Sequence, residues 1–386
     1  MKKRLLLAGL LILLLAVAAV AVACGEDEPA ATTAAPATTA GPATTAGPAT
    51  TAAPVTTAAP ATDTTAAPVG KAIELSIASQ HSPTAPAGHL VDAWAEEIKQ
   101  ATNGMLTLRQ YGNSQLIAPP ETLDGIRAGT ADIGNSFIFK GGPGFEVGVN
   151  LTQLVRGMTC ADGVRIFDAL WAEYAEIMES QWKDFKVLFI IPSVPTGIVT
   201  VDKAVRTMED IKGLQIRVPN QINADIQKAL GAAPVSMAVT DWLASLDKGT
   251  TDGAATTVGS LFDFQIGDKF KYITMFPLGN SVNFMVMNKD KWNSLSPDVQ
   301  KIVDDSLPGL RQRMIDTWAE ENEKNTEYCA EKGVQFIDLA PDEMARWNEA
   351  IRPVFDKMAA GMNDAGYPGT EIVDTAWELS SQSWAQ

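Results

Sequence analysis

Residues 25–70 decide how much of this chain can fold, because they form a repetitive segment of Ala, Thr and Pro. These 46 residues include 13 Thr and 7 Pro, and Pro recurs every six residues from Pro36 to Pro60. The segment has no apolar side chain larger than valine, so it cannot bury enough apolar surface to offset the entropy lost on folding. We expect a disordered linker here, which leaves residues 71–386 as the folded part.

The 24 residues before the linker have the pattern of an export signal. A basic start, Met1–Arg4, precedes 19 residues, Leu5–Ala23, that are all apolar or glycine. The run Ala-Val-Ala-Cys that ends at Cys24 resembles a bacterial lipobox, so we expect a signal peptide over residues 1–24 and lipidation of Cys24. The alternative is an uncleaved transmembrane anchor, since about 20 apolar residues span a bilayer. Both place the folded part outside the cytoplasm, in the periplasm or on the outer face of the cell membrane.

The charge of the chain excludes one class of partner. Of the net charge of −16, the signal carries +3 and the linker −4, so residues 71–386 carry −15. Nucleic-acid binding depends on Lys and Arg side chains that neutralise phosphates. We therefore expect no nucleic-acid partner.

Hydrophobic periodicity alternates between strand and helix patterns after residue 71. Strand patterns, one of them a short apolar run, cover residues 73–78, 105–111, 132–136, 186–191, 197–201, 214–218 and 233–237. Helical patterns cover residues 89–98, 119–128, 164–182, 221–230, 240–248 and 299–331. Such alternation predicts parallel sheets covered by helices on both faces. A folded part of 316 residues favours two α/β lobes over one.

The longest helical pattern, residues 299–331, follows a start signal. Ser296 provides an N-cap hydroxyl and Pro297 occupies the first turn. Pro308 and Gly309 interrupt the pattern. Either two helices meet at a bend, or one helix forms a spine shared by both lobes.

A search for catalytic and metal-binding patterns finds little. His81 and His89 are the two imidazoles of the chain, and neither G-x-S-x-G nor Cys-x-x-Cys occurs. The glycines of residues 141–144 lack the Lys and Ser or Thr of a phosphate loop, which indicates a turn. We expect no metal, no cofactor and no enzyme, and the hydrolase alternative would need His81 with a serine. Cys160 and Cys329 could form a disulfide or remain two buried thiols.

Six runs in the chain are similar to motifs of one family. They are residues 112–116 (GNSQL), 126–134 (IRAGTADIG), 208–219 (MEDIKGLQIRVP), 229–237 (ALGAAPVSM), 246–253 (LDKGTTDG) and 292–297 (WNSLSP). In this order they resemble the substrate-binding proteins of tripartite ATP-independent periplasmic (TRAP) transporters, which the C4-dicarboxylate receptors typify. The resemblance covers residues 71 to about 340.

The resemblance implies a fold and a function. The fold is a two-lobed, periplasmic-binding-protein-like (Venus flytrap) α/β fold over residues 71–386, with a long helix spanning both lobes. Lobe I would comprise about 71–194 and 282–320, and lobe II about 195–281 and the C-terminal helices. The function is an extracytoplasmic receptor that captures a small organic acid and delivers it to TRAP membrane subunits driven by an ion gradient. A binding subunit for a sensor is the alternative.

The resemblance also assigns a ligand-binding role to Arg217. The family places its carboxylate-binding arginine at this position, and a planar guanidinium can engage a carboxylate with two parallel hydrogen bonds. Arg217 also ends a strand pattern, where α/β sheets bind ligands. The alternative is a surface arginine paired with a nearby carboxylate.

Departures from the family pattern suggest an altered pocket. Thr256 replaces a common asparagine, and Val239 replaces a common phenylalanine. Phe137 and Phe139 replace polar residues, while Lys140 keeps a basic one. We expect a pocket that is less polar than a site for a dicarboxylate or a sugar acid.

These departures lead to a hypothesis about the ligand. We expect a monocarboxylate with an apolar or aromatic body, held by Arg217 and Lys140 against Phe137, Phe139 and Trp242. For each aromatic residue, core packing is an equal alternative. Gln80 and His81, which follow the first strand pattern, could add polar contacts, and His81 could equally belong to an ordinary loop.

Overall fold

The structure, a computed structural model, describes residues 72–138, 145–237 and 239–384. All of these residues belong to one compact unit, Ala66–Gln386, which is called the second unit below. The expected signal peptide and linker lie outside the described residues, as do Cys24, Phe139 and Lys140.

Two β-sheets organise the second unit. The first sheet has the strand order β2-β1-β3-β10-β4 and the second the order β11-β9-β5-β8-β6-β7. The strands of the first sheet are β1 (Ile73–Ser79), β2 (Leu106–Tyr111), β3 (Ile133–Phe137), β4 (Phe185–Pro195) and β10 (Asn280–Asn288). Those of the second are β5 (Gly197–Thr200), β6 (Gln215–Val218), β7 (Ala233–Ser236), β8 (Gly253–Thr256), β9 (Tyr272–Met275) and β11 (Gln335–Asp338). The predicted two-lobed α/β architecture is confirmed.

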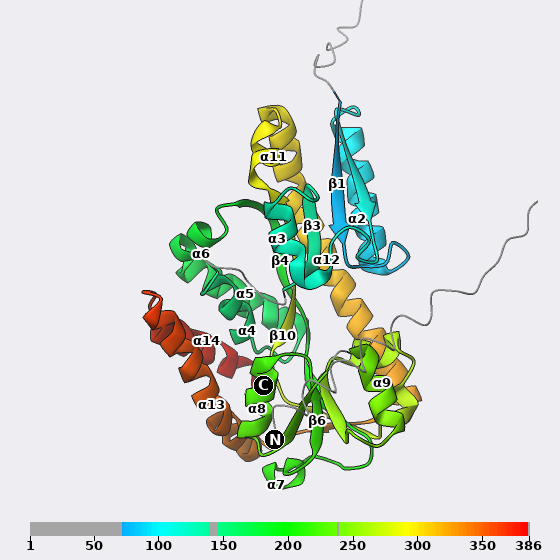
Figure 1. Cartoon of the computed structure of the whole chain (residues 1–386), viewed down its shortest axis with the longest axis vertical. Coiled ribbons are helices and arrows are strands. Elements are labelled where there is room, and N and C mark those ends of the chain that lie inside the picture. Colours follow the sequence, from blue (N-terminus) through cyan, green and yellow to red (C-terminus); the bar gives the residue numbers. More distant parts are fainter. Residues whose placement is uncertain (1–71, 139–144, 238, 385–386) are drawn as a thin grey trace, which may run out of the picture. The chain divides into compact units, whose positions relative to one another are not determined.

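Helices connect the strands and cover the sheets (Figure 1). In the first half of the unit they are α2 (Pro86–Ala101), the 3-10 turn η1 (Pro119–Glu121), α3 (Thr122–Arg127), α4 (Gly148–Leu154), α5 (Cys160–Glu173) and α6 (Ala175–Gln181). Then follow α7 (Met208–Ile211), α8 (Gln221–Ala229), α9 (Val239–Asp247), α10 (Val258–Asp263), the 3-10 turn η2 (Gly267–Lys269) and α11 (Lys289–Ser294). The C-terminal helices are α12 (Pro297–Glu331), α13 (Pro341–Asp364) and α14 (Gly369–Trp384).

Each sheet contains one strand that runs against the others, so the expectation of purely parallel sheets is wrong. Strand β10 is antiparallel to β3 and β4, and β5 is antiparallel to β8 and β9. The reason is how the chain changes sheets. It passes from β4 to β5 through Thr196 alone, and from β9 to β10 through residues 276–279. Neither connection contains a crossover helix, which a parallel entry would need.

The two passages bring the carboxyl ends of the strands in both sheets to one junction. Strand β4 runs in the same direction as β1, β2 and β3, and it ends at Pro195, directly before β5. The carboxyl ends of these strands therefore lie on the side of the first sheet where β5 begins. Gly197 begins β5 and pairs with Thr256, the last residue of β8. The carboxyl edge of the second sheet therefore also lies at the junction. In open α/β sheets this edge is where ligands bind.

Helix α12 is one helix of 35 residues, and the prediction of a helix spanning both lobes is confirmed. Pro308 lies inside the helix without ending it. Proline has no N–H to donate to the carbonyl of Asp304, but both residues are exposed, so water can satisfy that carbonyl. Towards its start the helix packs on the first sheet, where Trp94 Nε1 donates to Ser306 Oγ at 2.9 Å. Towards its end, the ring of Tyr328 meets that of Phe262 from α10 at 5.3 Å.

Two other expectations need correction. The pattern over residues 164–182 predicts one helix, but α5 and α6 separate at Tyr174, whose backbone leaves helical geometry while its hydroxyl contacts Thr375 Oγ1 at 2.9 Å. Strand β4 continues through Pro192 and Pro195 instead of stopping before them. It can do so because β4 is an edge strand, where a missing N–H donor is tolerated.

The remaining features concern thiols, charge and hydropathy. Cys160 and Cys329 are both free and buried, so the alternative of two buried thiols holds.

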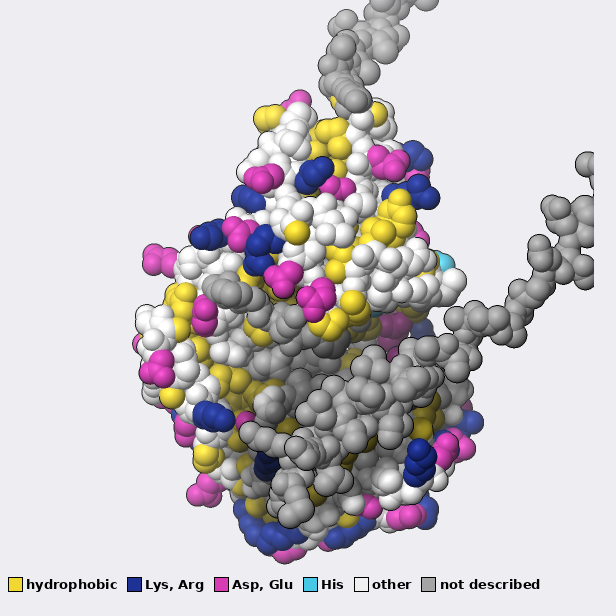
Figure 2. Space-filling model, in the orientation of Figure 1, with side chains coloured by type: hydrophobic (Ala, Val, Ile, Leu, Met, Phe, Trp, Pro, Cys, Tyr) yellow, Lys and Arg dark blue, Asp and Glu magenta, His cyan; other side chains and the backbone are white. Residues whose placement is uncertain are grey.

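On the face that Figure 2 shows, acidic and basic side chains are interspersed over the described residues. No helix among residues 72–138, 145–237 and 239–384 is long and apolar enough to cross a membrane.

Candidate functional site

Arg217 lies close to the carboxyl end of β6, between β8 and the edge strand β7 of the second sheet. Its neighbours Ile216 and Val218 are fully buried on the face that α8 covers, so strand alternation turns Arg217 to the opposite face. On that face Arg217 pairs in register with Ala254 of β8, which belongs to the same core as Trp242 of α9. The sequence therefore forces a guanidinium into an otherwise apolar layer.

The guanidinium of Arg217 is buried and has few protein partners. The side chain is 6 % exposed, and its Nε donates to the carbonyl of Met237 at 3.0 Å. The guanidinium carbon lies 5.8 Å from the centre of the Trp242 ring. No carboxylate of a described residue lies within ion-pair distance of Arg217, and burial lowers its pKa. A buried cation without a counter-charge provides an electrostatic site for an anion.

Trp242 and Thr256 complete the arginine group, by which we mean Arg217, Trp242 and Thr256. Trp242 is completely buried and packs on Phe270 at 5.4 Å, so it belongs to the core. Its ring also packs against the guanidinium of Arg217. Thr256 follows Ala254 by two residues on β8, which puts it on the same sheet face as Arg217. Its side chain is buried at the carboxyl end of the strand.

The candidates from the first sheet form a second group around His81. The imidazole of His81 is 9 % exposed, and its Nε2 lies 3.0 Å from Nδ2 of Asn283. The rings of Phe137 and Trp318 each lie 5.6 Å from it, and 5.6 Å from each other. We call His81, Phe137 and Trp318 the aromatic cluster. Burial lowers the pKa of His81 to about 4, so the imidazole is neutral at pH 7.

Gln80 has a local structural role. Its Oε1 accepts hydrogen bonds from Ser136 Oγ at 2.6 Å and from the backbone N of Phe137 at 3.0 Å. The side chain therefore fixes the end of β3 and, with it, the direction of Phe137. Gln80 orients the aromatic cluster, and its carbonyl oxygen is already occupied.

Trp318 and Asn283 contact His81 and are candidate site residues that the sequence did not suggest. Trp318 lies one helical turn after Met314 on the buried face of α12, so it extends the apolar face of that helix to the sheet edge. That spacing is visible in the sequence and could have identified Trp318. Asn283 carries no such local signal, because its partner His81 is 202 residues away.

The structure gathers the described candidates into two groups, one at the carboxyl edge of each sheet. The arginine group lies at the carboxyl edge of the second sheet, and the aromatic cluster lies at that of the first. Helix α12 links them, because it carries Trp318 and also packs on α10, which follows Thr256. Of the other candidates, Phe139, Lys140 and the side chain of Val239, the first residue of α9, lie outside what the structure describes.

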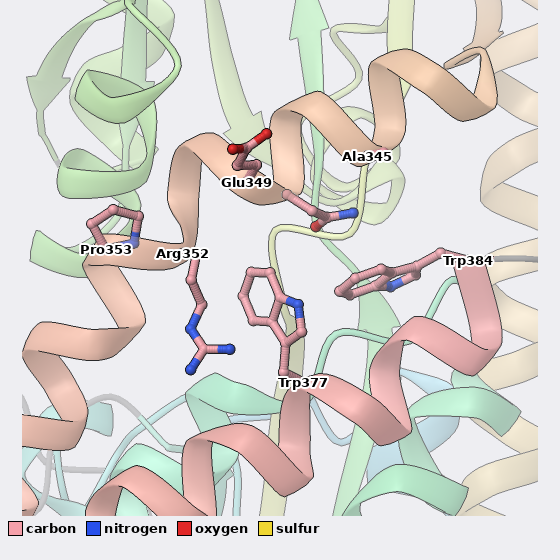
Figure 3. Close-up of a pocket in the computed structure, with 7 residues that line it drawn as sticks. Ala345, Glu349, Arg352, Pro353, Trp377 and Trp384 are labelled. Atoms are coloured by element: carbon pink, nitrogen blue, oxygen red, sulfur yellow. The ribbon is translucent and has the colours of Figure 1, made fainter.

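A pocket of about 660 Å³ lies elsewhere, between α13 and α14 (Figure 3). Its lining is Ala345, Asn348, Glu349, Arg352, Pro353, Trp377 and Trp384. Arg352 is its cation, but Asp356 and Asp374 already bind that guanidinium. Because these two carboxylates and Glu349 outweigh one arginine, this pocket is a poor site for an anion.

One family model matches the part of the chain that contains these candidate residues. The model described as bacterial extracellular solute-binding protein, family 7 (DctP), matches residues 77–361, which is most of the chain. The match includes Arg217, Thr256, His81 and Trp318.

Known relatives and solved structures agree with the family match. The chain is 24 % identical over 294 residues to the C4-dicarboxylate-binding periplasmic protein DctP of Rhodobacter capsulatus, covering 72 % of this chain and 84 % of that protein. A TRAP periplasmic solute-binding protein of Desulfovibrio salexigens superposes with a TM-score of 0.71 at 24 % identity, over 80 % of this chain and 96 % of that one. A marine metagenome TRAP solute-binding protein specific for aromatic acid ligands, in complex with metahydroxyphenylacetate, gives a TM-score of 0.69 at 24 % identity, over 81 % and 99 %.

Proposed function

Because the chain belongs to family 7 of the bacterial extracellular solute-binding proteins, we propose that it is the receptor of a TRAP-type transporter. It captures a small organic acid outside the cytoplasm and delivers it to membrane subunits that an ion gradient drives. The proposed role is binding by closure of two lobes, not catalysis. The junction at Thr196 and residues 276–279, where the chain changes sheets, supplies the hinge.

The buried guanidinium of Arg217 carries this proposal. Its Nε is engaged by the carbonyl of Met237, which fixes the plane of the guanidinium and leaves the two Nη groups for a ligand. A carboxylate bound by both groups would gain two charge-assisted hydrogen bonds, each of about 1.5–3 kcal/mol. Micromolar affinity needs about 8 kcal/mol, so Arg217 would orient the ligand and supply a large share of its binding energy.

The aromatic cluster supports a monocarboxylate with an aromatic body as the ligand. Phe137, Trp318 and a neutral His81 offer ring faces and edges at the carboxyl edge of the first sheet. Aromatic rings pack well against such surfaces, and no described lysine or arginine belongs to the cluster. The aromatic acid specificity of the metagenome relative is consistent with this ligand class.

Isothermal titration calorimetry with benzoate, phenylacetate and succinate tests the receptor function. We expect an aromatic acid to bind in the micromolar range or tighter, and Arg217→Ala to weaken it at least a hundredfold. Arg217→Lys keeps the charge but loses the planar fork, so about a tenfold loss is expected. Arg109→Ala, an exposed arginine on β2, is the matched control. Unchanged affinity in Arg217→Ala would contradict the assignment.

We also propose that a lipid on Cys24 anchors the receptor to the membrane. The lipobox-like run and the long linker after it support this arrangement. Metabolic labelling with radioactive palmitate should mark the wild-type chain, and Cys24→Ser should lose the label. An uncleaved anchor would instead retain residues 1–23, which intact mass spectrometry detects.

Delivery to a transporter distinguishes the receptor from a sensor subunit. Cells that express the chain with its membrane partners should accumulate labelled ligand, and dissipating the ion gradients should stop uptake. A chain that binds the ligand but supports no uptake would belong to a sensor.

A further inference from the structure

The aromatic cluster adjoins polar atoms that no described residue satisfies. Oδ1 of Asn283, Nδ2 of Asn135 and Nε1 of Trp318 are all buried without a hydrogen-bond partner. Asn135 and Asn283 have no exposed surface at all. An unsatisfied buried polar atom costs about 1–3 kcal/mol, so a group of them at one sheet edge is a candidate hydrogen-bonding site for a ligand.

The orientation of the Asn283 amide follows from its neighbours. Nδ2 donates to the carbonyl of Ser136 at 3.0 Å and lies 3.0 Å from His81 Nε2 and 3.3 Å from Asn135 Oδ1. Reversing the amide would set Oδ1 against the carbonyl oxygen of Ser136, where two acceptors would repel each other. The nitrogen therefore faces the protein, and Oδ1 is the free acceptor.

Trp318 supplies a free donor to the same cluster. An indole Nε1–H can only donate, and in Trp318 it is buried with no acceptor among the described residues. Both Trp318 and Asn283 contact His81, through ring packing at 5.6 Å and through the 3.0 Å approach of Asn283 Nδ2. Two neighbours of His81 thus carry one free acceptor and one free donor.

We propose that the ligand carries a hydroxyl group on its aromatic ring, which donates to Asn283 Oδ1 and accepts from Trp318 Nε1. This inference rests on the proposed function, in which Arg217 holds the carboxylate at the other edge. A hydroxyl is the small group that satisfies one acceptor and one donor at once. The ligand class is therefore a hydroxylated aromatic monocarboxylate.

Other substituents fit the cluster less well. A second carboxylate would need a cation, and the polar atoms around His81 belong to neutral amides, an indole and hydroxyls. An ammonium group could donate to Asn283 Oδ1 but would leave Trp318 Nε1 without an acceptor. An unsubstituted ring would leave both atoms unsatisfied, which is how a hydrogen-bonding site rejects an analogue that lacks the hydroxyl.

Calorimetry on the full chain, purified in detergent, tests the proposal with two pairs of acids. The pairs are benzoate with 3-hydroxybenzoate, and phenylacetate with 3-hydroxyphenylacetate, each with the 4-hydroxy isomer as well. We expect one hydroxylated isomer to bind at least tenfold tighter than its parent acid. Trp318→Phe keeps an aromatic wall but removes the donor. The dissociation constant of the parent acid divided by that of its hydroxylated isomer should therefore fall at least fivefold.

Trp171→Phe is the matched control, because Trp171 is a half-buried indole of the first lobe that packs on Phe167 at 5.8 Å, outside the aromatic cluster. It should leave the ratio unchanged. Equal affinity for parent and hydroxylated acids would overturn the hydroxyl proposal, since water would then satisfy the free atoms, while the receptor function would stand. Binding of succinate alone, abolished by Arg217→Ala, would also overturn it and keep Arg217. Binding of no acid would overturn both.

Discussion

Nη2 of Arg156 donates a 2.6 Å hydrogen bond to Oδ1 of Asn348, and this bond ties the chain just before α5 to α13. The Nε of Arg156 also donates to the carbonyl of Pro277, in the passage from β9 to β10, at 2.8 Å. Rings from three segments surround the guanidinium within 5.4 Å: Phe276, Phe355, Trp377 and Trp384. A buried arginine thus joins the hinge passage to the C-terminal helices.

Removing the acceptor of this bond should destabilise the fold. Burial lowers the pKa of Arg156 to about 9, so the guanidinium still carries its charge at pH 7. Asn348→Ala leaves a second buried Nη group unsatisfied beside Nη1, and we expect the free energy of unfolding to fall by about 2–3 kcal/mol. Urea denaturation measures the change. Glu349→Ala, at an exposed neighbouring position, is the control and should cost under about 0.5 kcal/mol.

His81 should make the free energy of unfolding depend on pH. Its folded pKa of about 4 lies below the usual 6.5, so between these values the unfolded chain binds more protons. Its contribution to stability is complete above pH 6.5 and is lost as pH falls towards 4, by about 3 kcal/mol. His81→Gln should reduce this loss. Urea denaturation at pH 7 and pH 4.5 tests it, and identical pH dependence in both proteins would contradict the buried, neutral imidazole.

Glu321 should have the opposite effect. It lies three residues after Trp318 on α12, and burial, with repulsion from Asp263, raises its pKa to about 7. Between pH 4.5 and 7 the folded chain therefore holds more protons, so stability falls as pH rises through this range. Glu321→Gln should raise the free energy of unfolding by about 1–3 kcal/mol at pH 8 and leave it unchanged at pH 4.

The control for Glu321 is Glu323→Gln, an exposed glutamate on the same helix, which should not change stability with pH. A stabilising effect of equal size at both pH values in Glu321→Gln would contradict the raised pKa. It would indicate improved packing or helix propensity instead of removal of a buried charge.

The sequence predicted the local elements better than their assembly. Alternation and turn residues place β1 and β6 correctly, because both signals are local. The antiparallel direction of β5 and β10 could not be read in this way, since it arises from a one-residue connection at Thr196 and from pairing with distant strands. Strand β4 continues through Pro192 because only its position at the sheet edge makes proline acceptable.

The same distinction applies to the site. The position of Arg217 near the end of a buried strand was predictable from local alternation, and its role as the ligand anchor stays a prediction. The fully buried Trp242 was expected as a candidate pocket wall, and it supports the guanidinium from within the core. Trp318, Asn283 and His81 come from three distant segments, so the cluster and its unsatisfied atoms exist only in the folded chain.

Thiol counting tests the buried cysteines and the lipid anchor together. Cys160 and Cys329 are buried, and burial raises the pKa of each thiol to about 11, so neither should react with Ellman's reagent in the folded protein at pH 8. In guanidinium chloride, two thiols should react per chain if Cys24 carries a lipid, and three if it does not. Fewer than two without a reducing agent would reveal a disulfide. Cys160→Ala is the control, since it should lower the denatured count by one.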